Sequence, residues 1–245
     1  MPTRLSAAVI DSSDPPTLAR WWASALGWEV TYEDENETDV EPPDGVPGIE
    51  LTFVPVHDPR VTKNRIHFDL RSTTSAEQDD LVQRLMATGA TAADIGQGNV
   101  PWAVLADPEG NEFCVLEPRP EYATTGALAA IVVDAENPQA VARFWAVAAG
   151  WELRSDEGLY DLIPPGGVGP RLEFILTEEP HTVKNRIHLD IAPFADDDHA
   201  TEVARLISLG AEPADVGQEK ADPDEVTWVV LRDPEKNEFC VLSCR

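Results

Sequence analysis

The sequence predicts an α+β protein in which one short strand-and-helix unit is repeated along the chain. Two long segments recur almost unchanged, since KNRIHFD at residues 63–69 returns as KNRIHLD at 184–190. DPEGNEFCVL at residues 107–116 likewise returns as DPEKNEFCVL at 233–242. Short apolar runs typical of strands alternate with stretches of helical spacing between these segments. Such ordered repetition indicates duplication of a folded unit.

A third match defines the boundaries of the duplicated unit. The pattern Ala-Arg-Trp-Trp at residues 19–22 is echoed by Ala-Arg-Phe-Trp at 142–145, and both are followed by Gly-Trp-Glu. The three matches occur in the same order along the chain. We therefore predict two homologous domains, near residues 1–120 and 126–245, and we interpret residues 117–126 at the join as a short linker.

The first helix has the clearest local signals. Residues 5–10 are apolar and predict a strand. Asp14 and two prolines then begin a helix, because proline is tolerated in the first helical turn. Apolar residues follow at helical spacing, and Gly27 ends the helix.

The remaining elements of the first half follow in order. We predict strands at residues 28–32 and 48–56, on either side of an acidic segment at 33–44 that we interpret as a solvated loop. Further strands are predicted at 64–70, 102–105 and 112–116, with a helix at 75–88 ended by Gly89. The pattern β-α-β-β(-β) therefore occurs twice per half.

Composition excludes several classes of function. The chain has 245 residues with 18 basic and 45 acidic side chains, a net charge of −27. This charge opposes binding to nucleic acids and anionic membrane surfaces, but it permits a cationic small ligand. The chain lacks an apolar run long enough to cross a bilayer. Its three cysteines give no disulfide framework, and we expect a cytoplasmic protein.

The three repeated motifs resemble a known group of proteins. The helix ending in Leu-Gly-Trp, the strand Asn-Arg-Ile-His-x-Asp and the hairpin Asp-Pro-Glu-x-Asn-Glu-Phe are similar to those of the glyoxalase / bleomycin resistance / extradiol dioxygenase (vicinal oxygen chelate) superfamily, in particular its glyoxalase-like domains. The resemblance implies tandem domains, each of two βαβββ modules that form a cupped mixed sheet. Helices would cover the convex face, and the concave face would hold a ligand. Whether modules pair within a half or across halves stays open.

The resemblance also implies a divalent metal held by the first and last strands of each module. His67 and Glu117 stand where the family places a histidine and a glutamate, and both suit such an ion. Ala7 and Val54 stand at the other two positions and cannot bind a metal. The first half thus keeps two of four candidate ligands.

Strand alternation predicts which side chains share the concave face with His67. Arg65 and Asp69 are expected to lie there beside it, and so is Glu117. Cys114 is expected to face the helices. The three side chains Arg65, His67 and Asp69 could instead form a polar network of their own, with Asp69 orienting the imidazole.

The second half repeats the strand but loses the acid. Arg186, His188 and Asp190 repeat the pattern of the first half, whereas Ser243 replaces the glutamate. Ala130 and Thr177 occupy the other two positions. A histidine that persists without the glutamate favours a role independent of metal, either structural or in contact with substrate.

Two further pairs are candidates for ligand binding. Glu50 and Glu173 occupy what we interpret as equivalent places facing the cup, where each could act as a general base or bind a cationic group. Both could instead be carboxylates at an open sheet edge. Trp102 and Trp228 precede the hairpin in each half, and they could line the cup for a planar ligand or pack in the core.

These observations favour a protein that binds a small organic molecule without a catalytic metal, and the acidic charge favours a cationic ligand. On this interpretation no cofactor is needed. The alternative is a metal-dependent lyase, isomerase or dioxygenase of glyoxalase type with one divalent metal in the first half. A third hypothesis is an interaction protein in which the two halves are only a scaffold. Both a monomer and a homodimer stay open.

Overall fold

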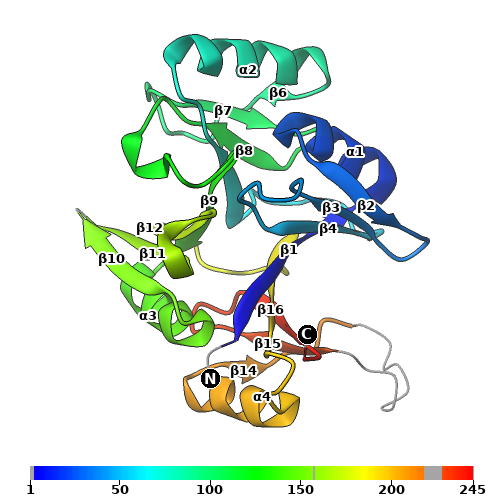
Figure 1. Ribbon diagram of the computed structural model, residues 1–245, viewed down its shortest axis with the longest axis vertical. Coiled ribbons are helices and arrows are strands. Elements are labelled where there is room, and N and C mark those ends of the chain that lie inside the picture. Colours follow the sequence, from blue (N-terminus) through cyan, green and yellow to red (C-terminus); the bar gives the residue numbers. More distant parts are fainter. Residues whose placement is uncertain (1–2, 157, 218–227, 245) are drawn as a thin grey trace.

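The computed structural model describes residues 3–156, 158–217 and 228–244, and over these residues it contains four α-helices and two eight-stranded sheets (Figure 1). The chain passes through four modules, each of which begins with a strand and a helix. The elements of modules 1 and 2 are β1 (Arg4–Ser12), α1 (Pro15–Leu26), β2 (Glu29–Glu33), β3 (Thr38–Glu41), β4 (Glu50–Pro55), β5 (Ile66–Leu70), α2 (Ser75–Ala87), β6 (Thr91–Ala92), β7 (Ala103–Ala106) and β8 (Glu112–Val115). The elements of modules 3 and 4 are β9 (Leu128–Ala135), α3 (Pro138–Ala149), β10 (Glu152–Asp156), β11 (Leu159–Ile163), β12 (Arg171–Leu176), β13 (Ile187–Ala192), α4 (His199–Ser208), β14 (Glu212–Pro213), β15 (Trp228–Arg232) and β16 (Glu238–Leu242). There are also two short 3-10 helices: η1 (Pro120–Tyr122) lies between modules 2 and 3, and η2 (Pro165–Gly167) lies between β11 and β12 of module 3.

The sheets combine modules from different halves of the sequence. Sheet I has the order β14-β15-β16-β13-β1-β4-β3-β2, and sheet II has the order β10-β11-β12-β9-β5-β8-β7-β6. Module 1 therefore pairs with module 4, and module 2 pairs with module 3. The joins are antiparallel, between β1 and β13 and between β5 and β9. The predicted α+β fold of βαβββ modules in mixed sheets is confirmed, and the pairing that the sequence left open runs across the halves.

The first helix of each half begins and ends as its sequence predicts. Asp14 caps α1 by accepting a hydrogen bond from the backbone N–H of Thr17, and Asn137 caps α3 in the same way. Gly27 and Gly150 end these helices with φ near +70°, a conformation that costs glycine little.

A single apolar core lies between the helices and one face of both sheets. The indole of Trp22 on α1 makes edge contacts with Phe68 of β5 and Phe113 of β8. In the second half Trp145 of α3 contacts Phe239 of β16. Since strand residues alternate between faces, the neighbours of these phenylalanines lie on the face away from the helices. We call this second face of each sheet its helix-free face.

The strand β3 was missed because it lies within the acidic segment 33–44. β3 reads Thr-Asp-Val-Glu, and its Thr38 and Val40 are buried while Asp39 and Glu41 are partly exposed. That alternation is the ordinary pattern of a half-buried strand, so the prediction of a loop over the whole segment is wrong. No helix in the described part of the chain is long and apolar enough to cross a membrane.

Candidate functional site

Three potential ligand atoms meet on the helix-free face of sheet II. His67 and Asp69 of β5 and Cys114 of β8 place one N, one O and one S atom within 4.8 Å of one another. We call them the His67 triad. The prediction that Cys114 faces the helices is wrong, because Phe113 occupies that side and Cys114 is the cross-strand partner of Asp69.

The duplication produces a second triad on sheet I. His188, Asp190 and Cys240 form the same cluster, which we call the His188 triad. Nε2 of His188 lies 3.5 Å from Oδ1 of Asp190 and 3.6 Å from Sγ of Cys240. The sequence signal for both cysteines is the phenylalanine before each one, a large apolar residue that belongs under a helix and therefore turns the thiol to the other face.

Burial shifts the pKa values of several triad groups toward their neutral forms. It raises the pKa of Asp69 and also the pKa of the Cys114 thiol, which the Asp69 carboxylate raises further. Burial lowers the pKa of His188 to about 4, and nearby Lys184 contributes in the same direction. A thiol is a nucleophile only as the thiolate, so the Cys114 thiol is not an activated nucleophile in this setting.

The donor set of the His67 triad nevertheless suits a divalent metal. Nδ1 of His67 and Oδ1 of Asp69 are buried and have no hydrogen-bond partner among the residues that the structure describes. Imidazole, carboxylate and thiolate together are ligands that zinc accepts, and a metal deprotonates a thiol that it binds. The residues that would hold the ion are therefore His67, Asp69 and Cys114.

The strand register corrects two positions inferred from the resemblance. On sheet II, His67 is opposite Val132 of β9, and Val132 is beside Glu173 of β12. Glu173, rather than Thr177, is thus the β12 side chain at the level of the triad. On sheet I, His188 is opposite Val9, and Val9 is beside Thr52. Thr52, rather than Val54, is thus the β4 side chain at the level of the His188 triad.

Glu117 does not join the His67 triad. It lies beyond the end of β8 and accepts a hydrogen bond of 2.8 Å from Nε of Arg119. The guanidinium of Arg119 lies 5.4 Å from the ring of Trp102, which packs beside Cys114 on the helix-free face. The structure therefore places Trp102 on the predicted face, and it pairs Glu117 with arginine instead of with His67.

The linker between the halves covers part of sheet II. Tyr122 of η1 is 2% exposed and donates a hydrogen bond of 2.7 Å to Oε1 of Glu173. Glu173 is 4% exposed, and burial raises its pKa to about 7. Sequence reasoning missed Tyr122 because it lies outside the repeated motifs.

Glu50 and Glu173 are not equivalent, contrary to the interpretation from the sequence. Glu50 is beside Ala7, whereas Glu173 is beside Val132, two residues further along the corresponding strand. The counterpart of Glu50 in the second half is Arg171, which is beside Ala130 and forms an ion pair on the same face. Both glutamates do lie on helix-free faces, as alternation predicts.

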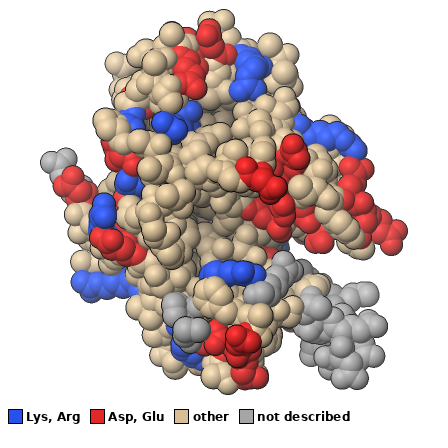
Figure 2. All heavy atoms as spheres, in the orientation of Figure 1, with Lys and Arg blue, Asp and Glu red and all other residues tan. Residues whose placement is uncertain are grey.

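Acidic side chains gather on sheet I around Glu50. Its Oε1 accepts a hydrogen bond of 3.1 Å from Thr52, and its pKa is raised to about 7 by burial and then by Asp39 and Glu41 of β3. We call Asp39, Glu41 and Glu50 the β3–β4 carboxylates. Figure 2 shows that acidic side chains also gather over the β2–β3 hairpin next to them.

Trp228 lies on the same helix-free face as the His188 triad. It is opposite Leu242 in the pairing of β15 with β16, and Val230 in the same strand is opposite Cys240. The indole is 36% exposed. Trp228 therefore lies in the module 4 part of the helix-free face of sheet I, and the β3–β4 carboxylates lie in the module 1 part of the same face.

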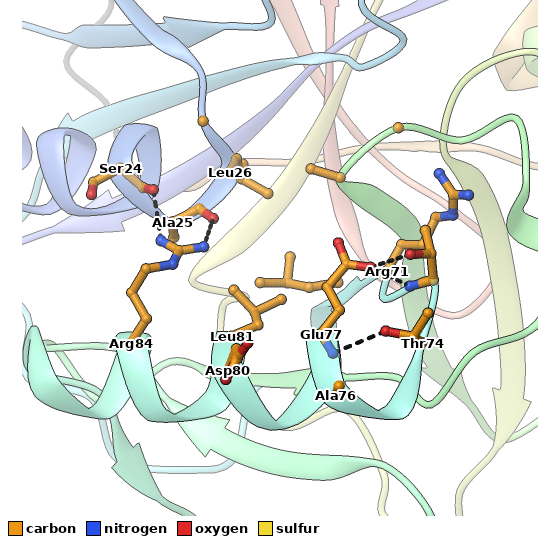
Figure 3. A pocket seen from close by; sticks show the side chains of 15 residues that line it. Ser24, Ala25, Leu26, Arg71, Thr74, Ala76, Glu77, Asp80, Leu81 and Arg84 are labelled. Atoms are coloured by element: carbon orange, nitrogen blue, oxygen red, sulfur yellow. Dashed lines mark hydrogen bonds between the residues drawn. The ribbon is translucent and has the colours of Figure 1, made fainter.

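Arg65 and Arg186 lie apart from the triads. Both line a cleft of about 390 Å³ between two related loops of the two halves. A larger groove of about 930 Å³ lies between α1 and α2 (Figure 3). In that groove Arg84 of α2 donates hydrogen bonds to the backbone oxygens of Ser24 and Ala25, where α1 ends. Neither hollow contains a triad residue.

Comparisons with known proteins agree with this architecture. A model of the glyoxalase-like domain matches residues 7–116 and 130–242. No curated protein matches the sequence. Among solved structures, a candidate dioxygenase from Bacillus subtilis is similar with a TM-score of 0.66 at 15% identity, over 99% of this chain and 86% of that one. Glyoxalase I from Zea mays is similar with a TM-score of 0.63 at 15% identity, over 98% of this chain and 92% of that one.

Proposed function

Because the chain belongs to the glyoxalase-like domain family, we propose that it is a small-molecule binding protein whose ligand is an organic cation held on the helix-free face of sheet I. The observation that carries this proposal is the group of β3–β4 carboxylates. Two acidic side chains, Asp39 and Glu41, gather around the partly buried Glu50, and a cation would relieve the repulsion between the three carboxylates.

The contrast between the two sheets supports sheet I as the binding face. On sheet II, Tyr122 and Arg119 from the linker lie over the face, and Glu173 is engaged by the tyrosine. On sheet I, Glu50 is only partly buried and Trp228 is exposed at the other side of the face. Aromatic surfaces bind organic cations favourably, so the face combines charge with a flat apolar contact.

Binding of a planar dye tests the proposal. We expect the whole chain to bind methylene blue, an organic cation, and to exclude an anionic sulfonated dye of similar size. Glu50→Gln should weaken binding about tenfold, the loss expected when one charge-assisted contact with the cation is removed. Glu35→Gln removes an equal charge from an exposed turn and is the matched control. Equal affinity of both variants, or no saturable binding of the cation, would contradict the proposal.

A second candidate function is a metal-dependent lyase, isomerase or dioxygenase that uses the His67 triad. The observation that favours it is the N, O and S donor set of that triad with its unpartnered imidazole nitrogen. A bound ion would polarise an oxygen of the substrate. Metal analysis of the purified protein tests it. Stoichiometric metal that is lost in Cys114→Ser but kept in Glu117→Ala would support it, and metal-free wild-type protein would count against it.

A further inference from the structure

The two halves of the chain meet at a cleft that the proposed function does not use. Its volume is about 390 Å³, and it lies between residues 58–65 of the first half and residues 179–186 of the second. These loops are related by the duplication, since each leads into the strand Asn-Arg-Ile-His. The cleft is therefore bordered by two copies of the same sequence motif.

Each half sends one arginine across this cleft to the other half. Nη1 of Arg65 donates a hydrogen bond of 2.6 Å to the backbone oxygen of Glu179, and Nη1 of Arg186 donates one of 3.0 Å to the backbone oxygen of Asp58. The side chains of Arg65 and Arg186 are 11% and 14% exposed. Reciprocal contacts thus hold both guanidinium groups at the cleft between the two halves.

Basic side chains are concentrated here in a strongly acidic protein. Five of the 18 lysines and arginines line the cleft, namely Arg60, Lys63, Arg65, Lys184 and Arg186. Lys184 lies 2.6 Å from Asp11, and Lys63 and Arg60 also have close carboxylate partners. The two crossing arginines have more distant carboxylate partners, although Nη2 of Arg186 also donates a hydrogen bond of 2.9 Å to the backbone oxygen of Asp11.

The carboxylates nearest the crossing arginines are engaged elsewhere. Glu235 lies 3.6 Å from Arg65, but it accepts hydrogen bonds from the backbone at the start of α3. Glu109 lies 3.8 Å from Arg186, and it accepts hydrogen bonds from the backbone before α1. Each carboxylate forms an ion pair with the arginine that faces it, but at a distance too long for a hydrogen bond.

Several guanidinium donors therefore remain without an acceptor. Nε and Nη2 of Arg65, Nε of Arg186 and Nε of Arg60 are buried and have no hydrogen-bond partner in the part of the chain that the structure describes. A buried charged donor without an acceptor is costly. A bound group with several negative oxygens would supply acceptors for donors of this kind.

We propose that this cleft binds a compact oxyanion, a carboxylate or phosphate group, between Arg65 and Arg186. The planar fork of arginine matches both groups with paired hydrogen bonds. Three acids line the cleft: Asp58 and Glu179 have exposed side chains that can remain in water, and the buried Asp11 is paired with Lys184 at 2.6 Å. Val61 and Val183 are exposed apolar side chains of the lining and could contact an apolar part of the same ligand.

Titration of the whole chain with two probes, inorganic phosphate and benzoate, tests this proposal at constant ionic strength set with chloride. We expect saturable binding of at least one probe, and the preferred probe identifies the oxyanion. Arg186→Gln should weaken that binding about tenfold or more, as expected for a charge-assisted hydrogen bond. Arg143→Gln, at an exposed position of α3, should leave it unchanged. Arg65→Lys keeps the charge but loses the fork, and it should also weaken binding.

The outcomes separate this site from the one on sheet I. Methylene blue binding should be unaffected by Arg186→Gln, and oxyanion binding should be unaffected by Glu50→Gln. If Arg186→Gln does not fold, Arg60→Gln provides the test, because its side chain is 28% exposed and contributes one of the unpartnered donors. No saturable binding of either probe, or equal affinity in the arginine variants and Arg143→Gln, would overturn the proposal.

Discussion

Tyr122 donates a hydrogen bond of 2.7 Å to Glu173, and this contact joins the linker between the halves to the helix-free face of sheet II. Both side chains are buried, so neither group can exchange its partner for water. Burial raises the pKa of Glu173 to about 7, and the Tyr122 hydrogen bond partly opposes that rise. The linker therefore packs against sheet II through this hydrogen bond, in addition to connecting the two halves.

Tyr122→Phe should destabilise the protein by about 1–3 kcal/mol, because it leaves a buried carboxyl group without its donor. Urea denaturation measures the change. Tyr32→Phe is the matched control, since the Tyr32 hydroxyl also donates to a carboxylate, that of Asp34, but at an exposed site. We expect the control to change the free energy of unfolding by less than about 0.5 kcal/mol. A similar loss of unfolding free energy in both variants would show that the buried Tyr122–Glu173 hydrogen bond stabilises the protein no more than an exposed one.

The pKa of Glu50 predicts how stability changes with pH. In the folded protein it is about 7, raised by burial and then by Asp39, from 4.5 as the ordinary value. The folded state therefore holds a proton that the unfolded state releases between these values. This stabilising contribution is complete below about pH 4.5 and is lost as the pH rises through 7.

Glu50→Gln should remove that pH dependence. The variant should be more stable than the wild-type protein at pH 8 and differ little from it near pH 4.5, because glutamine cannot become charged. Urea denaturation over this pH range, with Glu35→Gln as the control, measures the difference. A wild-type stability that rises between pH 5 and 8 relative to the Glu50 variant would contradict the assignment.

Gly126 of the linker packs closely against Pro47 of module 1. A Cβ atom added there would lie 2.3 Å from the backbone oxygen of Pro47, and φ is +83°. Gly126→Ala should therefore cost about 2–4 kcal/mol, through a clash in addition to backbone strain. Gly45→Ala has a similar φ of +78° with open space around the new atom, and it should cost only about 1 kcal/mol. Thermal unfolding compares the two, and equal losses would mean that the segment around Pro47 moves aside freely.

The sequence predicted the four modules and the placement of His67 on a helix-free face, because repeats and strand alternation are local signals. It could not predict how the modules pair, since all four begin with the same strand and helix and any two could join. Cys114 was assigned to the wrong face because strand alternation alone does not show which face of β8 lies under the helices. The packing of Trp22 on Phe113 decides that choice. Glu50 and Glu173 were equated because both lie in similar apolar runs, and only the register with β1 and β9 separates them. Tyr122 had no signal in the repeats.

Two kinds of contact hold the modules together: strand pairing within the sheets and aromatic packing between the modules of one half. Hydrogen bonds join module 1 to module 4, whereas Trp22 of module 1 packs on Phe68 and Phe113 of module 2. The indole N–H of Trp22 also donates a hydrogen bond of 3.1 Å to Asp107, and that of Trp145 donates one of 3.0 Å to Asp233. Each half is therefore held by its own tryptophan while each sheet is shared between the halves.

This arrangement predicts that the chain unfolds in one step. Trp22→Phe should cost about 1–3 kcal/mol, since a buried aspartate loses a donor, and Trp145→Phe should cost a similar amount. Because the sheets link the halves, each substitution should shift a single transition, and circular dichroism and tryptophan fluorescence should report the same midpoint. Separate transitions, with only one of them moved by Trp22→Phe, would mean that the halves fold independently and that the shared sheets contribute little to cooperativity.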